Sequence, residues 1–141
     1  MALVWREQLS VGNEVIDSDH RYLIDIVNRI EESLGNKNRK ELIAGVDSLG
    51  NYSQQHFVRE EKIALAAGYK QVPNLSESHA ALLVKLEQVK RDVEAMGQEW
   101  SAETAKALTS LLRDWLIDHV IKEDLLMKPT LQKHSPLFDP R

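Results

Sequence analysis

The sequence predicts an all-α protein, an antiparallel up-down four-helix bundle with an N-terminal arm and a short C-terminal tail. Apolar residues recur at helical spacing through four segments, and no segment alternates as a strand would. Short connections rich in glycine, asparagine or proline separate the segments, which favours antiparallel neighbours. The chain of 141 residues is the size of one domain, so we expect a single domain over residues 1–141.

The ends of the predicted helices follow from capping and breaking residues. We expect four helices, over residues 17–34, 40–67, 75–96 and 101–128. Gly68 is a suitable C-terminal cap for the second helix. Asn74 and Glu77 have the spacing of a capping box, with Asn74 as the N-cap of the third helix. Pro129 is expected to end the fourth helix.

Composition excludes several kinds of site and partner. Hydrophobic residues make up 43% and charged residues 28%, and the net charge is −4 with both signs interspersed. We therefore expect no nucleic-acid partner, because such proteins usually carry a basic stripe. The chain has no cysteine, which leaves histidine, aspartate and glutamate as its strong metal ligands. No signal sequence or spanning apolar run is visible, so we expect a soluble cytoplasmic protein without a membrane partner.

Histidines and carboxylates point to a metal in the bundle core. Each predicted helix carries one histidine: His20, His56, His79 and His119. Imidazoles pointing into one core would each need a polar partner, and a shared metal is an economical one. His56 and Glu60 lie at i and i+4, so both side chains leave the same helix face. Glu61 lies one step around the helix and is expected in solvent.

The last helix offers two carboxylates after its histidine. Glu123 follows His119 at i+4 and Asp124 follows it at i+5. Five residues turn the direction by roughly 140°, so helical geometry leans towards Glu123 without deciding between the two. Nitrogen and oxygen donors of this kind suit iron, manganese or zinc, and bridging carboxylates would suit a pair of ions.

Three stretches of the sequence resemble those of the bacterial hemerythrins. They are Leu9-Ser10-Val11-Gly12 with Val15-Ile16-Asp17 and Asp19-His20, then His56-Phe57 with Glu60-Glu61, and then Trp115-Leu116 with His119 and Asp124. The resemblance extends from about Trp5 to Leu131. Several motifs occur in order at compatible spacings, which makes the resemblance specific.

The resemblance implies two non-haem iron ions joined by an oxo or hydroxo bridge, with dioxygen as the ligand. The implied metal ligands are His20, His56, Glu60, His79, His119 and Asp124. The first two histidines would hold the iron that takes up dioxygen, the other two would hold the second iron, and the carboxylates would bridge. The resemblance thus selects Asp124 over Glu123. Leu116 would line the oxygen pocket, with Trp115 nearby.

Leu75 departs from the family pattern. The family has two histidines four residues apart on the third helix; His79 matches the second, and Leu75 stands at the first. Three alternatives follow. The second iron keeps an open position, Glu77 replaces the missing imidazole although it suits a helix cap better, or metal binding is weakened in a regulatory bundle.

The resemblance implies a dioxygen carrier or sensor more than an enzyme. Its role would be oxygen storage, delivery or sensing, with dioxygen or a related small ligand as the partner. The alternative is an oxidase or peroxidase activity enabled by the open position beside Leu75. A sensing role would require an electron-transfer or signalling partner.

Overall fold

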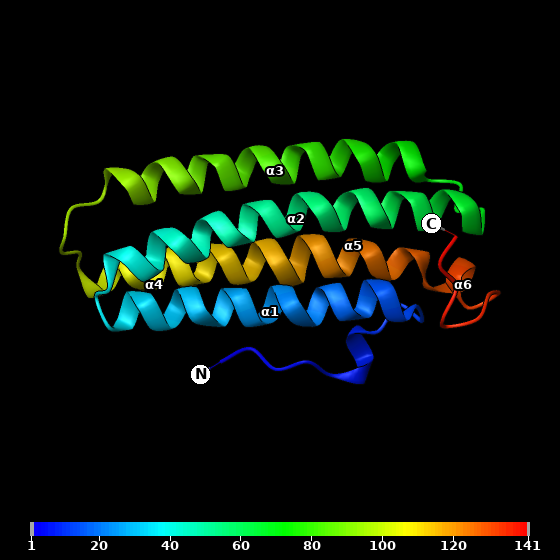
Figure 1. Cartoon of the computed structure of the whole chain (residues 1–141), viewed down its shortest axis with the longest axis horizontal. Coiled ribbons are helices and arrows are strands. Elements are labelled where there is room, and N and C mark those ends of the chain that lie inside the picture. The colour runs from blue at the N-terminus through cyan, green and yellow to red at the C-terminus, as the bar shows by residue number, and fades with distance from the viewer. Residues whose placement is uncertain (1, 141) are drawn as a thin grey trace.

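The computed structural model describes residues 2–140 and consists of four long, closely packed helical rods (Figure 1). Along the chain the helices are α1 (Glu14–Gly35), α2 (Arg39–Ala67), α3 (Val72–Ala95), α4 (Ala102–Arg113), the π-helical segment η2 (Asp114–Ile121), α5 (Lys122–Asp124), the 3-10 turn η3 (Leu125–Met127) and α6 (Lys128–Leu131). The segments from α4 to α6 follow one another without a break and form the fourth rod. The described residues contain no strand, and the predicted all-α bundle is confirmed.

Three of the long helices begin at a residue whose side chain caps the first turn. The side chain of Asn13 accepts a hydrogen bond from the backbone N–H of Ile16 at the start of α1. Asn38 and Ser101 cap α2 and α4 in the same way. Gly68 ends α2 with a φ of +89°, a left-handed conformation that favours glycine, so the predicted cap is confirmed.

The start of α3 differs from the capping-box prediction. The helix begins at Val72, and Pro73 lies in its first turn, where a proline needs no N–H partner. Asn74 is consequently inside the helix, and its side chain bonds to Gln71 instead of capping a backbone N–H. The predicted capping box of Asn74 and Glu77 is therefore wrong.

The fourth rod also differs from a uniform α-helix. Pro129 does not end it, because this proline lies in the first turn of α6, where its missing N–H costs nothing. The rod contains the eight-residue π-helical segment η2. Hydrogen bonds in a π-helix join residues i and i+5, so side chains there face other directions than α-helical spacing predicts.

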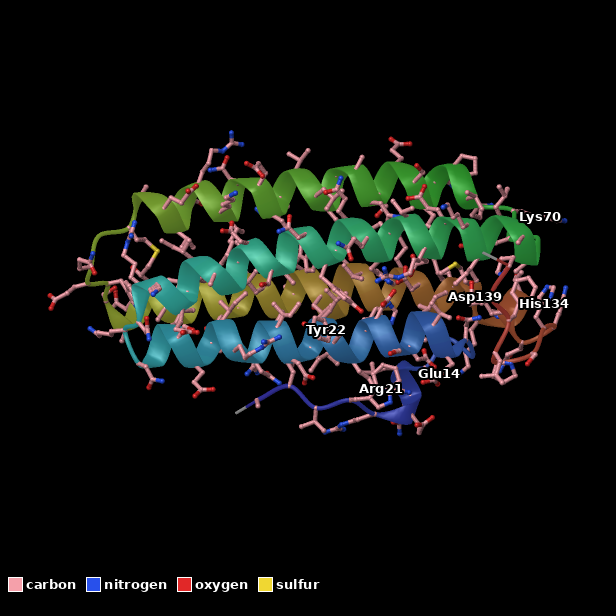
Figure 2. The ribbon with its side chains drawn as sticks, viewed as in Figure 1. Glu14, Arg21, Tyr22, Lys70, His134 and Asp139 are labelled. Carbon is pink, nitrogen blue, oxygen red and sulfur yellow. The ribbon has the colours of Figure 1, made fainter. Side chains whose placement is uncertain are left out.

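The two ends of the chain pack against α1. The arm contains the short 3-10 helix η1 (Glu7–Leu9), and the backbone of Leu3 exchanges hydrogen bonds with the Asn28 side chain. The tail packs at the start of α1, where the backbone N–H of Glu14 donates to the carbonyl of Pro136 at 2.7 Å. Figure 2 shows His134 and Asp139 of the tail at the end of the bundle where Glu14 lies. Within residues 2–140, no helix is long and apolar enough to cross a membrane.

Candidate metal centre

The candidate site forms a polar layer between two apolar clusters. The larger cluster fills most of the bundle, and a smaller one closes the end near α6. On each rod a buried histidine or carboxylate of the candidate site stands between a member of each cluster: His20 between Ile16 and Leu23, Glu60 between Phe57 and Ile63, His79 between Leu75 and Leu82, and Asp124 between Ile121 and Met127. The helices thus bring these side chains to one level, away from water.

Four of the predicted ligands form the first donor group. One nitrogen or oxygen from each of His20, His56, Glu60 and Asp124 lies within 4.8 Å of all the others. His20 Nε2 is 2.7 Å from Asp124 Oδ2 and 3.9 Å from Glu60 Oε2. His56 Nε2 is 3.0 Å from Glu60 Oε2 and 3.6 Å from Asp124 Oδ2. All four residues are 0–1% exposed.

Several polar atoms of this group lack a hydrogen-bond partner. His56 Nε2 and Glu60 Oε2 are close, but their contact does not have hydrogen-bond geometry, and both atoms remain unsatisfied among the described residues. His20 Nδ1 and Asp124 Oδ1 are also buried without a partner there. A buried polar atom without a partner costs roughly 1–3 kcal/mol, so these side chains favour a bound cation among them; His20 Nδ1 points away from the Nε2 that faces Asp124 and does not contribute to this preference.

The electrostatics of the group favour a positive occupant. Burial alone would raise the pKa of Glu60, but the positive charge of His56 and neighbouring hydrogen bonds lower it to about 2. Burial and the charge of Glu60 raise the pKa of Asp124 to about 6. Two carboxylates so close together cannot easily both be charged without a cation. A metal ion would replace the protons that otherwise balance them.

His56 is oriented by a buried carboxylate behind it. Asp19 Oδ2 lies 2.9 Å from His56 Nδ1 and accepts its hydrogen bond when that nitrogen is protonated, which leaves Nε2 free to face the site. Arg59 donates two hydrogen bonds to Asp19, at 3.0 and 2.8 Å, and Tyr52 donates one at 2.6 Å. Burial opposes the charge, but these bonds hold the pKa of Asp19 well below its usual range. The sequence interpretation had no role for Asp19.

His79 is oriented in the same way by Glu61. Its Nδ1 lies 2.8 Å from Glu61 Oε2, and its Nε2 lies 3.0 Å from Glu60 Oε1. The ring also stacks on Phe57, with centroids 3.9 Å apart. Glu61 is only half-buried, but the expectation that it is simply solvated is wrong, because it fixes the ring of His79.

A second donor group adjoins the first. One nitrogen or oxygen from each of His79, Glu123 and Asp124 lies within 4.8 Å of the other two. Asp124 belongs to both groups, so its carboxylate connects them. Glu123 is half-buried, and its Oε1 is buried without a hydrogen-bond partner among the described residues.

The structure does not bring His119 to the site, which corrects the expectation that every helix turns its histidine into the core. The side chain is 60% exposed, and its Nε2 lies 3.3 Å from Oδ2 of the exposed Asp114. Both residues lie in the π-helical segment η2. In this segment Trp115, Leu116 and Val120 face the core, and His119 faces outward.

Leu75 and Glu77 occupy different surroundings. Leu75 is 2% exposed and belongs to the smaller apolar cluster, so an apolar side chain stands where the family has a histidine. Glu77 is exposed, and the structure does not place it with either donor group. The alternative in which Glu77 replaces the missing imidazole is therefore not supported.

The two residues expected at the oxygen pocket are buried in the larger cluster. Leu116 is 0% exposed and Trp115 is 2% exposed. Trp115 Nε1 donates a hydrogen bond to the backbone carbonyl of Leu82 at 3.1 Å, which fixes the indole between α3 and η2. Both side chains thus form apolar wall on the core side of η2.

Comparison with known proteins identifies the family of this bundle. The family model of the hemerythrin HHE cation-binding domain matches residues 11–131. The chain belongs to the hemerythrin family. Hemerythrins are non-haem iron proteins, and this chain is therefore a non-haem iron protein of that family.

Relatives support this membership over nearly the whole chain. The chain is 31% identical to a bacteriohemerythrin of Methylococcus capsulatus over 93% of its length and 98% of that protein. It is 26% identical to a bacteriohemerythrin of Stenotrophomonas maltophilia, over 96% of the chain and 86% of that protein. A crystal structure of a wild-type hemerythrin superposes with a TM-score of 0.78 at 25% identity, covering 94% of this chain and 99% of that one.

The donor set fits iron. Two imidazoles and two carboxylates in the first group are the nitrogen and oxygen ligands that non-haem iron takes in proteins. Their unpartnered atoms and the mutual repulsion of Glu60 and Asp124 are what a bound cation would relieve.

Proposed function

We propose that this chain binds dioxygen reversibly at a non-haem iron centre, for oxygen storage, delivery or sensing. The observation that carries the proposal is the first donor group, in which His20, His56, Glu60 and Asp124 converge with unpartnered atoms in a dry core. Iron bound there supplies the electrons and the open coordination position that dioxygen binding requires.

The chain's own residues would hold, orient and shield this centre. Glu60 Oε1 lies 3.0 Å from His79 Nε2 and Glu60 Oε2 lies 3.0 Å from His56 Nε2, so this carboxylate contacts a histidine of each donor group. Asp19 and Glu61 hold the rings of His56 and His79 with Nε2 directed at the site. We propose that Leu116, with Trp115 beside it, forms an apolar wall that limits water entry and irreversible oxidation.

The test is a cycle of oxygenation on the iron-loaded protein. The protein is reduced without oxygen, exposed to air, and then returned to an inert atmosphere while its optical spectrum is recorded. We expect a new absorption on aeration that disappears when oxygen is removed, over repeated cycles. Complete and irreversible oxidation during the first aeration would refute reversible binding.

Two variants control the experiment. Glu60→Gln removes a charge from the centre of the site and is expected to abolish both iron retention and the spectral change. Glu77→Gln makes the same change in an exposed residue of α3 and is expected to behave as the wild type. A spectral change that survives Glu60→Gln would place oxygen binding somewhere else.

A further inference from the structure

We propose that Glu123 completes a second metal position with His79 and Asp124, in place of imidazoles from positions 75 and 119. The inference rests on the proposed function, because it concerns a second ion in the same centre. Glu123 would be a metal ligand of this chain, whereas the resemblance to the bacterial hemerythrins selects Asp124 and not Glu123.

The geometry of the second donor group suits one ion. Ligand atoms about 2.0–2.2 Å from a metal lie at most about 4.4 Å apart. The atoms of His79, Glu123 and Asp124 lie within 4.8 Å of one another, so a small contraction brings them into coordination. His79 and Asp124 are 2% and 1% exposed, which leaves these donors shielded from water.

Unpartnered atoms mark this position independently of the distances. Glu123 Oε1 and Asp124 Oδ1 are buried, and neither has a hydrogen-bond partner among the described residues. An exposed carboxylate would direct both oxygens to water. Glu123 is half-buried, and its Oε1 is shielded from water. A cation at this position would satisfy both atoms.

The other donors considered for this position are directed elsewhere. His119 is 60% exposed and lies beside Asp114 on the outer face of η2. Leu75 offers only hydrocarbon to the smaller apolar cluster, and Glu77 is exposed. Glu60 and Glu61 contact the two ring nitrogens of His79, and Glu123 is the carboxylate that joins His79 and the shared Asp124 in the second donor group.

The second position is also connected to the first. Asp124 is a member of both donor groups. Glu60 Oε1 lies 3.0 Å from His79 Nε2, while Glu60 Oε2 lies 3.0 Å from His56 Nε2. Asp124 therefore links the two donor groups, and Glu60, a member of the first group alone, contacts the His79 ring of the second.

The test counts iron and locates it. Apoprotein is titrated anaerobically with ferrous iron, desalted, and analysed for iron per chain by mass spectrometry. Variants Glu123→Gln, His119→Gln and Glu77→Gln are compared with the wild type, and circular dichroism checks that each is folded. Anomalous diffraction from crystals of the iron-loaded wild type, measured at the iron absorption edge, locates the iron directly. This measurement does not depend on any variant.

We expect two irons per chain in the wild type, in His119→Gln and in Glu77→Gln, and a loss to one in Glu123→Gln. An anomalous peak should lie next to Glu123 and His79. Two irons in Glu123→Gln, a loss in His119→Gln or Glu77→Gln, or a single iron in the wild type would each overturn the assignment of Glu123 while leaving iron binding intact. A wild type that binds no iron would overturn the proposed function as well.

Discussion

Replacing Asp19 by asparagine should weaken iron binding about 10–100-fold, because it removes the charge that orients His56. Asp19 is 5% exposed and does not belong to either donor group. Its Oδ2 is the hydrogen-bond partner of His56 Nδ1 at 2.9 Å, and the imidazole is wholly buried. The asparagine side chain has nearly the same shape, so the change acts on charge and hydrogen bonding more than on packing.

The magnitude follows from the contacts of this carboxylate. Partners behind a metal-bound histidine typically contribute 10–100-fold in affinity, which is about 1.4–2.7 kcal/mol. The asparagine amide can still accept one hydrogen bond, but it can no longer match the paired N–H groups of Arg59 as a carboxylate does. In one orientation it also directs an N–H towards His56, which favours the wrong tautomer.

The assay is anaerobic competition for ferrous iron against a chromogenic chelator. Tyr52→Phe is the matched control, since it removes one hydrogen bond from Asp19 and leaves the contacts with His56 and Arg59. We expect the control to bind iron nearly as the wild type does. Equal affinities for Asp19→Asn and the wild type, within about twofold, would refute the idea that Asp19 acts through His56.

Three further changes test other parts of the bundle. Leu75→Ala should lower the free energy of unfolding of the apoprotein by about 2–5 kcal/mol in urea denaturation, and a smaller loss would mean that the site collapses around the cavity. Leu116→Ala should speed irreversible oxidation of the reduced, iron-loaded protein in air; an unchanged rate would contradict a shielding role for Leu116. Removal of iron by a chelator should lower the thermal midpoint, since a ligand at 100 times its Kd stabilises the folded state by about 2.7 kcal/mol. Equal midpoints with and without iron would argue against a site that exists only in the folded protein.

The fold was predictable because helical periodicity is a local property of the sequence. The apolar stripe that includes Leu23 and Ile30 places α1 in the core, and Gly68 ends α2 where predicted. The start of α3 was less predictable. Asn74 is a good cap in isolation, but Pro73 fits the first turn of a helix equally well, and tertiary packing decides between the two.

The residue types of the site were predictable from the sequence, but the directions in which their side chains face were less so. The structure brings His20, His56 and Glu60 together, as one histidine per helix and the i, i+4 pairing suggested, and adds Asp124, which only the resemblance to the bacterial hemerythrins had selected. The orienting role of Asp19 depends on its partners on α2, which no spacing within α1 reveals. Its position next to His20 was the available signal, but neighbours in a helix face different directions.

The outward direction of His119 was hidden for a different reason. Arguments from helical spacing assume a uniform α-helix, and η2 breaks that assumption over eight residues. A π-helical segment cannot be recognised from apolar periodicity alone, because its pattern resembles an α-helix with small irregularities. The geometric lean towards Glu123 was made relative to His119, whereas the structure places Glu123 with His79.

The departures from the family pattern are physically linked. The apolar side chain of Leu75 occupies the place of the family's histidine, and His119 is turned to the surface. His79 would therefore be the only imidazole left for a second ion. A lone imidazole and shared carboxylates would hold that ion weakly. As proposed above, Glu123 would add a negatively charged oxygen donor at that ion in place of neutral nitrogen donors, and a negative donor stabilises the ferric state relative to the ferrous state.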